Sequence, residues 1–324
     1  MTRFRHIATL VVGLSLSAAL GYLAVRNVKW SATWTALRHS EYVWLAPALA
    51  ALALSIAIRV ERWRLLFRSE SRPPFGAASK AILIGFLFNI VLPLRAGEAA
   101  RIIALRSYAR TSSAETTATV VVERLFDVLS LLFLLFACLH WLPHVTWIRA
   151  AAWLALVTVA CTVALAGAGV LLRRPGNAST PRLLRVPFVE EATVRRLTTS
   201  VADGLAALRQ PGQGAAALAL TLLSWLVLAF SFWLLMIAFR LHLPAVAALF
   251  VAITTGLSFV IPSAPGAVGV FEAAGLTVTN AYHVPTSTAL AYILVLHALN
   301  VFPFVIAGVG VLAVQGRGRR RNAH

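Results

Sequence analysis

Residues 81–98 read AILIGFLFNIVLPLRAGE, and this stretch decides how the chain folds. Its apolar run, Ala81 to Leu94, is fourteen residues long, whereas a membrane-spanning helix needs about 20. The run ends in Pro93 and Gly97, which a straight span does not do. Pro93 lacks the backbone N–H that a helix interior needs, and Gly97 allows the chain to turn. The stretch predicts a broken or re-entrant helix, which a bilayer tolerates only where protein or water lines it.

A second short apolar run, Ala245 to Ile261, ends in a similar way. The residues that make up the Pro, Gly and acidic pattern of the two breaks are Pro93, Gly97, Glu98, Pro262, Gly266, Gly269 and Glu272. A pair of interrupted apolar segments in corresponding halves of a chain marks the central site of many transporters. Two kinked helices without a site would show the same prolines. The repeat and the ionisable residues beside it favour a cavity.

The composition places the chain in a membrane. It is 60% hydrophobic and 12% charged, with a mean hydropathy of +0.82, whereas soluble domains are about half apolar and a quarter charged. The apolar runs are of helical length and do not alternate as barrel strands do. We therefore predict an all-α, polytopic membrane protein with about six full spans and two broken segments in an inverted repeat. The expected spans are Ile7–Val25, Tyr42–Ile58, Thr116–Leu139, Ile148–Leu172, Ala215–Phe239 and Thr288–Val314.

The basic residues predict the orientation. The net charge is +18, and most arginines lie in short segments beside apolar runs, as the positive-inside rule expects. This distribution argues against nucleic acid as a partner. If both broken segments are hairpins, every strong arginine cluster falls on one face, including the expected cytoplasmic loop Arg59–Arg72. We predict an inner-membrane protein with cytoplasmic termini. The first run has the basic start of a signal peptide, but its length favours an uncleaved span.

Four regions are expected along the chain. They are a first membrane half at 1–172, a cytoplasmic linker at 173–214 with an amphipathic helix at Val189–Leu208, a second half at 215–316, and a basic tail at 317–324.

Charged residues at membrane depth are the candidate site. Arg95, Arg101 and Arg124 nearly balance Glu98, Glu123 and Asp127. Spacings of three and four residues would place Glu98 with Arg101, and Glu123 with Asp127, on shared helix faces. A charge at the bilayer centre costs roughly 2.5–3.5 kcal/mol, so such groups should be paired or wet. The alternative is that they lie near the interface, where the cost is small. Our hypothesis is a polar cluster whose arginines bind a lipid phosphate.

Other residues carry weaker signals. Glu272 has no basic neighbour nearby in the sequence, and His297 and Asn300 fit packing or interhelical hydrogen bonds equally well. Cys138 and Cys161 lie in apolar runs and indicate neither a disulfide nor a metal site. No nucleotide-binding or metalloenzyme motif is present. We expect no enzyme activity, no cofactor and no metal.

Three ordered motifs resemble a known family. They are Asn89-x3-Pro93-x3-Gly97-Glu98-x2-Arg101, Val122-Glu123-Arg124-x2-Asp127 and Pro262-x3-Gly266-x2-Gly269-x2-Glu272. Together with Arg59-x2-Arg62-Trp63-Arg64 they resemble the lysylphosphatidylglycerol synthase transmembrane-region family, or flippase-like domain proteins, over residues 7–315. The resemblance implies a membrane domain with a central cavity that moves lipids between leaflets. The chain ends ten residues after the last expected span, so we expect a stand-alone member without the synthase domain.

The sequence therefore predicts a lipid translocase for an anionic phospholipid or a polyprenyl- or lipid-linked substrate. The predicted substrate-binding residues are Asn89, Pro93, Arg95, Gly97, Glu98, Arg101, Glu123, Arg124, Asp127, Pro262, Gly266, Gly269 and Glu272. The alternative is a non-transporting accessory that binds a lipid-synthesis or glycosyltransferase partner through residues 173–214. A lipid-modifying enzyme acting through Glu123 and Asp127 is a third, weaker alternative. A homo-oligomer is left open.

Overall fold

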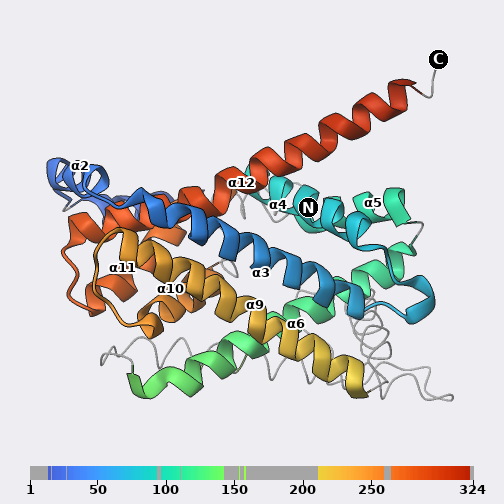
Figure 1. The fold of residues 1–324 in the computed structure, drawn as a ribbon, viewed down its shortest axis with the longest axis horizontal. Coiled ribbons are helices and arrows are strands. Elements are labelled where there is room, and N and C mark those ends of the chain that lie inside the picture. The colour runs from blue at the N-terminus through green and yellow to red at the C-terminus, as the bar shows by residue number, and fades with distance from the viewer. Residues whose placement is uncertain are drawn as a thin grey trace.

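The described part of the chain is built from helices and contains no strand. The computed structural model describes residues 14–15, 17–26, 28–92, 96–109, 111–141, 153, 157, 211–258 and 264–321. Figure 1 shows the helices in an elongated arrangement, with α12 extending beyond the other helices at the C-terminal end. The all-helical, membrane-type fold expected from the sequence is thus observed.

Three helices are long and apolar enough to cross a membrane. The 3-10 turn η1 (Tyr42–Trp44) and helix α3 (Leu45–Leu65) form one of 24 residues. The others lie within α9 (Pro211–Ala238) and α12 (Thr286–Arg321), with apolar segments of 27 and 30 residues. They correspond to three of the predicted spans.

Helices α3 and α9 pack against each other in antiparallel orientation. Ser55 donates its hydroxyl hydrogen to the Ser224 carbonyl at 2.9 Å, and Ser231 donates to the Ala48 carbonyl at 2.7 Å. The hydroxyls satisfy their hydrogen-bonding needs on carbonyls of the partner helix, which an apolar surrounding requires. This antiparallel pair forms the centre of the molecule (Figure 1).

Helix α3 continues beyond Ile58, the expected end of the second span. Residues 59–64 form the last two turns of α3, and the short turn η2 (Ser69–Ser71) comes only after them. Arg62 continues the buried stripe of Leu52 and Ser55 at helical spacing, and Arg59 between them is half-buried. The helix therefore goes on past the last apolar residue of the run.

Helix α6 (Ser113–Cys138) has 26 residues and follows the predicted span at Thr116–Leu139 closely; the short turn η3 (Leu139–Trp141) ends it. Of the predicted first span, residues 14–15 and 17–25 are described, and they are helical. The predicted span Ile148–Leu172, apart from residues 153 and 157, and the amphipathic helix Val189–Leu208 lie outside the described residues.

The first broken segment is a tight helical hairpin. Helix α4 (Phe75–Val91) is followed after four residues by α5 (Ala96–Ala109), which packs back along it. The backbones approach so closely that a Cβ on Gly97 would lie 2.0 Å from the Gly85 carbonyl oxygen. The Gly97 N–H also donates to Asn89 Oδ1 at 2.9 Å. Gly97 is therefore required for close approach of the two helices.

The second broken segment is also a helical hairpin. It consists of α10 (Ala245–Ser258), the 3-10 turn η5 (Pro265–Ala267) and α11 (Val270–Ala281). Gly266 and Gly269 have φ values of +67° and +85°, a left-handed conformation that glycine adopts without strain. Thr254 of α10 donates to the Ala274 carbonyl of α11 at 3.4 Å, so the two helices run side by side.

The α4–α5 and α10–α11 hairpins lie toward opposite ends of the α3–α9 pair (Figure 1). The end of α4 contacts η5 of the second hairpin, since a Cβ at Gly266 would lie 3.8 Å from the Ile90 carbonyl oxygen. The helix at residues 17–25 covers the second turn, where the Ala264 N–H donates to Ser17 Oγ at 2.8 Å. Helix α2 (Trp30–Arg38) lies at one end of the molecule.

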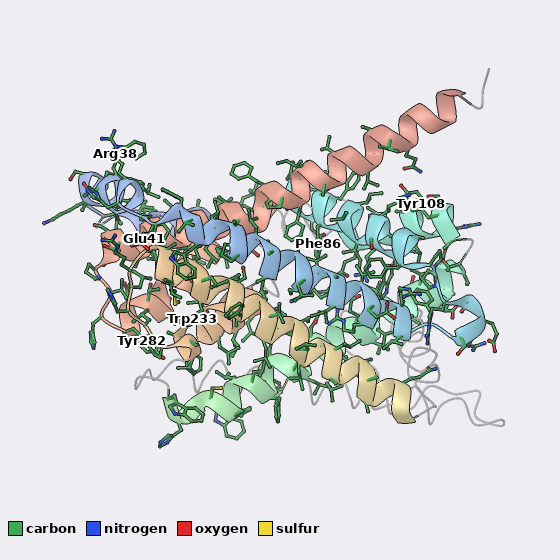
Figure 2. All side chains as sticks on the ribbon, viewed as in Figure 1. Arg38, Glu41, Phe86, Tyr108, Trp233 and Tyr282 are labelled. Atoms are coloured by element: carbon green, nitrogen blue, oxygen red, sulfur yellow. The ribbon has the colours of Figure 1, made fainter. Side chains whose placement is uncertain are left out.

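Side chains fill the space between these helices (Figure 2). One buried core joins α3, α9, α10 and α12 around Phe232, Phe250 and Tyr292. A second joins the end of α3 to α4, α5 and α6 around Trp63 and Leu105. The charged residues of α5 and α6 lie beside this second core, and they form the site described next.

Candidate functional site

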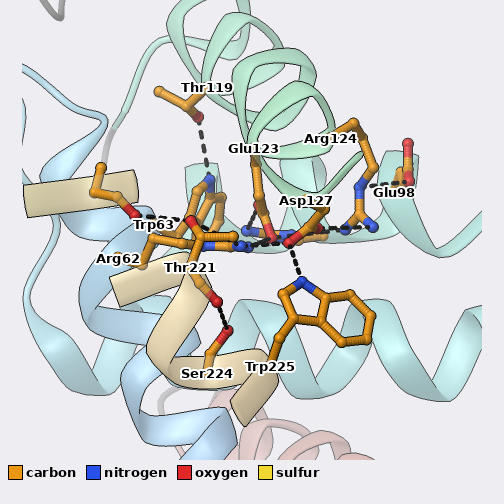
Figure 3. Close-up of polar contacts among 12 residues, drawn as sticks. Arg62, Trp63, Glu98, Thr119, Glu123, Arg124, Asp127, Thr221, Ser224 and Trp225 are labelled. Atoms are coloured by element: carbon orange, nitrogen blue, oxygen red, sulfur yellow. Dashed lines mark hydrogen bonds and ion pairs between the residues drawn. The ribbon is translucent and has the colours of Figure 1, made fainter. Parts of the chain in front are cut away.

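Arg62 is the centre of a buried charged cluster (Figure 3). Its side chain is 0% exposed. One terminal nitrogen, Nη1, lies 2.5 Å from Asp127 Oδ1, and the other, Nη2, lies 2.5 Å from Glu123 Oε1. The planar guanidinium presents two donors in a fixed fork, which suits two carboxylates one helical turn apart. Arg62 thus joins the end of α3 to the first half of α6.

Arg101 of α5 holds the other oxygen of Glu123. Its Nη2 lies 2.5 Å from Glu123 Oε2. The guanidinium carbon lies 3.5 Å from the centre of the Trp63 ring, in a cation–π arrangement. Trp63 in turn donates its indole N–H to Thr119 Oγ1 at 3.2 Å. The carboxylate of Glu123 is therefore shared by arginines from two different helices.

Helix α9 closes the cluster on a third side. Trp225 donates its indole N–H to Asp127 Oδ1 at 3.3 Å. Arg62 Nη1 also lies 3.5 Å from Thr221 Oγ1. The guanidinium carbon of Arg59 lies 4.4 Å from the centre of the Trp225 ring. This indole therefore contacts a carboxylate with its edge and an arginine with its face, as its charge distribution favours.

The cluster has one open edge, at Arg124 and Glu98. The Arg124 side chain is 42% exposed and that of Glu98 is 31% exposed, and Arg124 Nε lies 3.3 Å from Glu98 Oε1. Arg124 also reaches Asp127 Oδ2 at 3.4 Å and Glu123 Oε1 at 3.6 Å. These contacts are longer than the 2.5 Å contacts of Arg62, and one of the three partners, Glu98, is partly exposed. Arg124 is therefore the member most accessible to a ligand.

The charges in this cluster do not cancel. We call Arg59, Arg62, Glu98, Arg101, Glu123, Arg124 and Asp127 the charged cluster. Its four arginines outnumber its three carboxylates by one positive charge. Among the described residues Arg59 forms no ion pair, and its guanidinium group lies over the Trp225 ring. An excess positive charge in an apolar surrounding favours an anion at the open edge.

Glu272 lies at the turn of the second hairpin and pairs with a histidine. The sequence left two roles open for it, holding an arginine or exchanging protons, and the structure pairs it with no arginine among the described residues: its Oε1 lies 2.5 Å from His297 Nδ1 of α12. Its Oε2 accepts a hydrogen bond from the Gly269 N–H at 2.6 Å. Gly266 likewise serves this turn, since its carbonyl lies 2.8 Å from His297 Nε2. The reason is that the turn of the second hairpin folds back onto α12, where His297 supplies the missing partner.

The sequence model of one protein family, described as Lysylphosphatidylglycerol synthase TM region, matches residues 10–308. The chain belongs to this family. A search of curated proteins found no match. The family is a membrane domain associated with lipid-related function, and the three long apolar helices of this member agree with that description.

Some of the remaining predicted site residues of this family member are placed by the structure, and others lie outside the described residues. Asn89 and Gly97 close the first hairpin by their mutual hydrogen bond, and Glu98 follows them in the charged cluster. Pro93, Arg95 and Pro262 lie outside the described residues. Glu98 and Arg101 lie three residues apart on α5, and each pairs with a residue of α6: Glu98 with Arg124, and Arg101 with Glu123.

Arg59 and Arg62 were missed as site residues of this family member, along with Trp225. The signal for the arginines was present, because they continue the face of α3 that carries Leu52 and Ser55, at spacings of three and four residues. Their position after an apolar run suggested a loop instead. Trp225 carries no comparable signal, since a tryptophan in an apolar span usually packs in the core or at the interface. Among the described residues, no three His, Cys, Asp or Glu side chains are grouped to hold a metal ion.

Proposed function

We propose that the protein translocates a lipid with an anionic head group between the leaflets of the membrane. The observation that carries the proposal is that the charged cluster has one arginine more than carboxylates, and that Arg124 at its open edge is 42% exposed. A phosphate is a suitable ligand, because arginine donates two parallel hydrogen bonds to it. The family's association with lipid-related function supports this assignment. The substrate is an anionic phospholipid or a polyprenyl- or lipid-linked phosphate.

The cluster divides into a holding part and a receiving part. Glu123, Asp127, Arg62 and Arg101 hold one another at contacts of 2.5 Å. Arg124 has only long contacts, so an arriving phosphate can replace Glu98 beside it. Arg59 adds a second guanidinium without a described carboxylate partner. The acyl chains stay in the bilayer while the head group passes along this polar path. No covalent bond changes, so we propose a translocase and not an enzyme.

We further propose six spans and an inverted repeat of the two halves, in the inner membrane with both termini in the cytoplasm. Three apolar helices of spanning length and the two hairpins support this topology. The hairpins lie toward opposite ends of the α3–α9 pair (Figure 1). Such a pair surrounds a site accessible from either face in turn.

A reconstituted liposome assay tests the proposal. Labelled phosphatidylglycerol is placed in one leaflet, and its appearance in the other is followed for wild type, Arg124→Ala and Glu98→Gln. We expect Arg124→Ala to slow movement by about tenfold or more, the effect of one charged hydrogen bond of about 1.5–3 kcal/mol. Arg240→Gln is the matched control, because its pair with Glu41 is exposed and lies at the far end of the molecule (Figure 2).

Equal rates for Arg124→Ala and wild type would contradict the assignment of the receiving arginine. A purified protein that moves no lipid, but co-purifies with a lipid-synthesis enzyme, would support the accessory function instead. That partner is a proposal from the sequence of residues 173–214, which lies almost wholly outside the described residues.

A further inference from the structure

Glu272 and His297 form a buried pair that the charged cluster does not use. Both residues are less than 10% exposed. His297 Nδ1 lies 2.5 Å from Glu272 Oε1, and His297 Nε2 lies 2.8 Å from the Gly266 carbonyl oxygen. The imidazole stacks on Phe271 with ring centres 4.4 Å apart, which holds its orientation. The pair lies at the turn of the second hairpin, where that turn meets α12.

The contacts determine how many protons the pair holds. A carbonyl oxygen only accepts, so Nε2 carries a hydrogen toward Gly266. A nitrogen and a carboxylate oxygen 2.5 Å apart also need a hydrogen between them. The second oxygen, Oε2, already accepts from the Gly269 N–H. The pair therefore holds one proton more than a neutral imidazole and an ionised carboxylate would hold.

No other described ionisable group compensates the pair. Helix α10 and the turn η5 contain no ionisable side chain, and Glu272 is the one acidic residue of α11. Helix α12 contributes Tyr292, which faces the Phe232 carbonyl of α9, and basic residues only from Arg317 onward. The helix at residues 17–25 contributes Tyr22, and α4 contributes Lys80 near its distant end. Loss of the shared proton would leave an unpaired negative charge at membrane depth, which is unfavourable unless water enters.

The pair is linked to the first hairpin through Gly266. The Gly266 carbonyl accepts from His297, and the same residue lies against the Ile90 backbone at the end of α4. Gly269 closes the other side of the turn, packed within van der Waals distance of Gly21. A rearrangement of the Glu272–His297 pair would therefore alter the contact between Gly266 of the second hairpin and Ile90 of the first.

We propose that Glu272 and His297 form the proton-binding site that couples lipid movement to a proton gradient. The proposal rests on the proposed function above. With the shared proton bound, η5 is in contact with the end of α4, as observed at Gly266 and Ile90. When the proton leaves to water on one face, Nδ1 and Oε1 repel each other, and η5 separates from the end of α4. A proton from the opposite face then restores the contact, so each cycle moves one proton and no other bond changes.

Glu272→Gln is the decisive variant because it imitates the protonated pair. Its amide oxygen can accept from the Gly269 N–H, and its NH₂ group can donate to a neutral His297 Nδ1. His297→Ala removes the pair and is the second variant. Asn300→Ala is the matched control on the same helix, because its side chain bonds only the Leu296 carbonyl one turn away.

The first measurement needs no lipid movement. The full chain, with Cys138 and Cys161 replaced by serine, carries spin labels at Ile90→Cys and Val268→Cys, and their dipolar broadening is recorded from pH 5 to 9. We expect the labels to separate as pH rises in the wild-type background and in Asn300→Ala. Glu272→Gln should keep the short distance at every pH, and His297→Ala should lose the transition. A pH-independent wild-type distance would overturn the proton-binding site.

The second measurement is made in liposomes with a pH gradient and a clamped membrane potential. We expect the gradient to shift the steady-state distribution of labelled phosphatidylglycerol for wild type and Asn300→Ala, but not for Glu272→Gln. Lipid that moves in wild type without responding to the gradient would overturn the coupling and leave the translocase function intact. Lipid that does not move at all, with a pH-dependent label distance, would overturn the translocase function and its coupling while supporting the proton-binding site.

Discussion

Arg62 holds two carboxylates of a helix to which it does not belong. Its contacts to Glu123 and Asp127 are both 2.5 Å, and none of the three side chains is more than 7% exposed. A buried ion pair contributes little net stability when complete, but it becomes strongly destabilising when one partner is removed. At the scale of the residue, the main effect of removing Arg62 would be to leave the buried carboxylates of Glu123 and Asp127 without this partner.

Arg62→Gln should lower the free energy of unfolding by about 3–5 kcal/mol, because Glu123 and Asp127 lose a buried partner. Denaturation with SDS in mixed micelles, followed by tryptophan fluorescence, measures the change. Arg64→Gln is the control two residues away, since its pair with Glu61 is exposed by 21% and 41% and should contribute less than about 1 kcal/mol. Similar losses in both variants would show that Arg62 is not held as described.

Asp127→Asn tests the same cluster without changing its volume. The asparagine keeps an oxygen for the Trp225 indole N–H but loses the charge that faces Arg62, so the cluster gains a second excess positive charge. We expect a loss of about 1.5–3 kcal/mol in the free energy of unfolding, the range for a charged hydrogen bond. Glu41→Gln, whose partner Arg240 is exposed, serves as the control in the same denaturation experiment. An unchanged midpoint for Asp127→Asn would contradict the ion pair.

At the scale of the element, the α4–α5 hairpin depends on a backbone contact and not on side-chain packing alone. Gly85 and Gly97 face each other where the two helices cross, and Asn89 bonds the Gly97 N–H one turn further on. Helix α12 lies over the same hairpin, with the Phe86 and Phe304 ring centres 4.8 Å apart. The hairpin is therefore one packed unit with no room for a side chain at Gly97.

Gly97→Ala should destabilise this unit, because the new Cβ would lie 2.0 Å from the Gly85 carbonyl oxygen. Overpacking of this kind costs about 1–3 kcal/mol. Gly76→Ala is the matched control in α4, since a Cβ there meets nothing within 4 Å and alanine favours the helix by up to about 1 kcal/mol. Thermal unfolding in detergent should separate the two variants, and a stable Gly97→Ala would contradict the close approach.

At the scale of the whole molecule, the two hairpins lie toward opposite ends of the bundle, so each end consists of different elements. The start of α4 and the end of α5 lie at one end, whereas α2 and the end of α11 lie at the other (Figure 1). If both hairpins are re-entrant, each returns to the face from which it entered. The distribution of arginines then assigns the α4–α5 end to the cytoplasm.

Single-cysteine labelling tests this topology. In a background without Cys138 and Cys161, cysteine at the exposed positions Ser107 and His283 is treated with a membrane-impermeant maleimide. We expect His283→Cys to react in intact spheroplasts, and Ser107→Cys to react only after permeabilisation. Ser31→Cys, at the α2 end, should behave like His283→Cys. Labelling of all three positions from the same face would contradict the re-entrant arrangement.

Several features could be predicted from the sequence alone. The membrane setting, the helical class and the positions of both breaks follow from local properties: apolar runs of spanning length, and Pro and Gly where a helix must end. Glu123 and Asp127 were also recognisable, because an acidic residue within an apolar run is unfavourable enough to need a partner. Each of these conclusions depends only on residues that lie within a few helical turns of one another in the sequence.

The identity of the partners was decided by the tertiary structure. Arg62 is 61 residues from Glu123, and Trp225 is 98 residues from Asp127. Spacing within one helix indicated only which residues share a face, whereas packing of α5 against α6 decides that Glu98 pairs with Arg124 and Arg101 with Glu123. In the same way, helix packing pairs Glu272 with His297 and with no arginine among the described residues. The physical reason is that a buried charge takes the partner that packing brings within about 3–4 Å, and helix packing is not a local property of the chain.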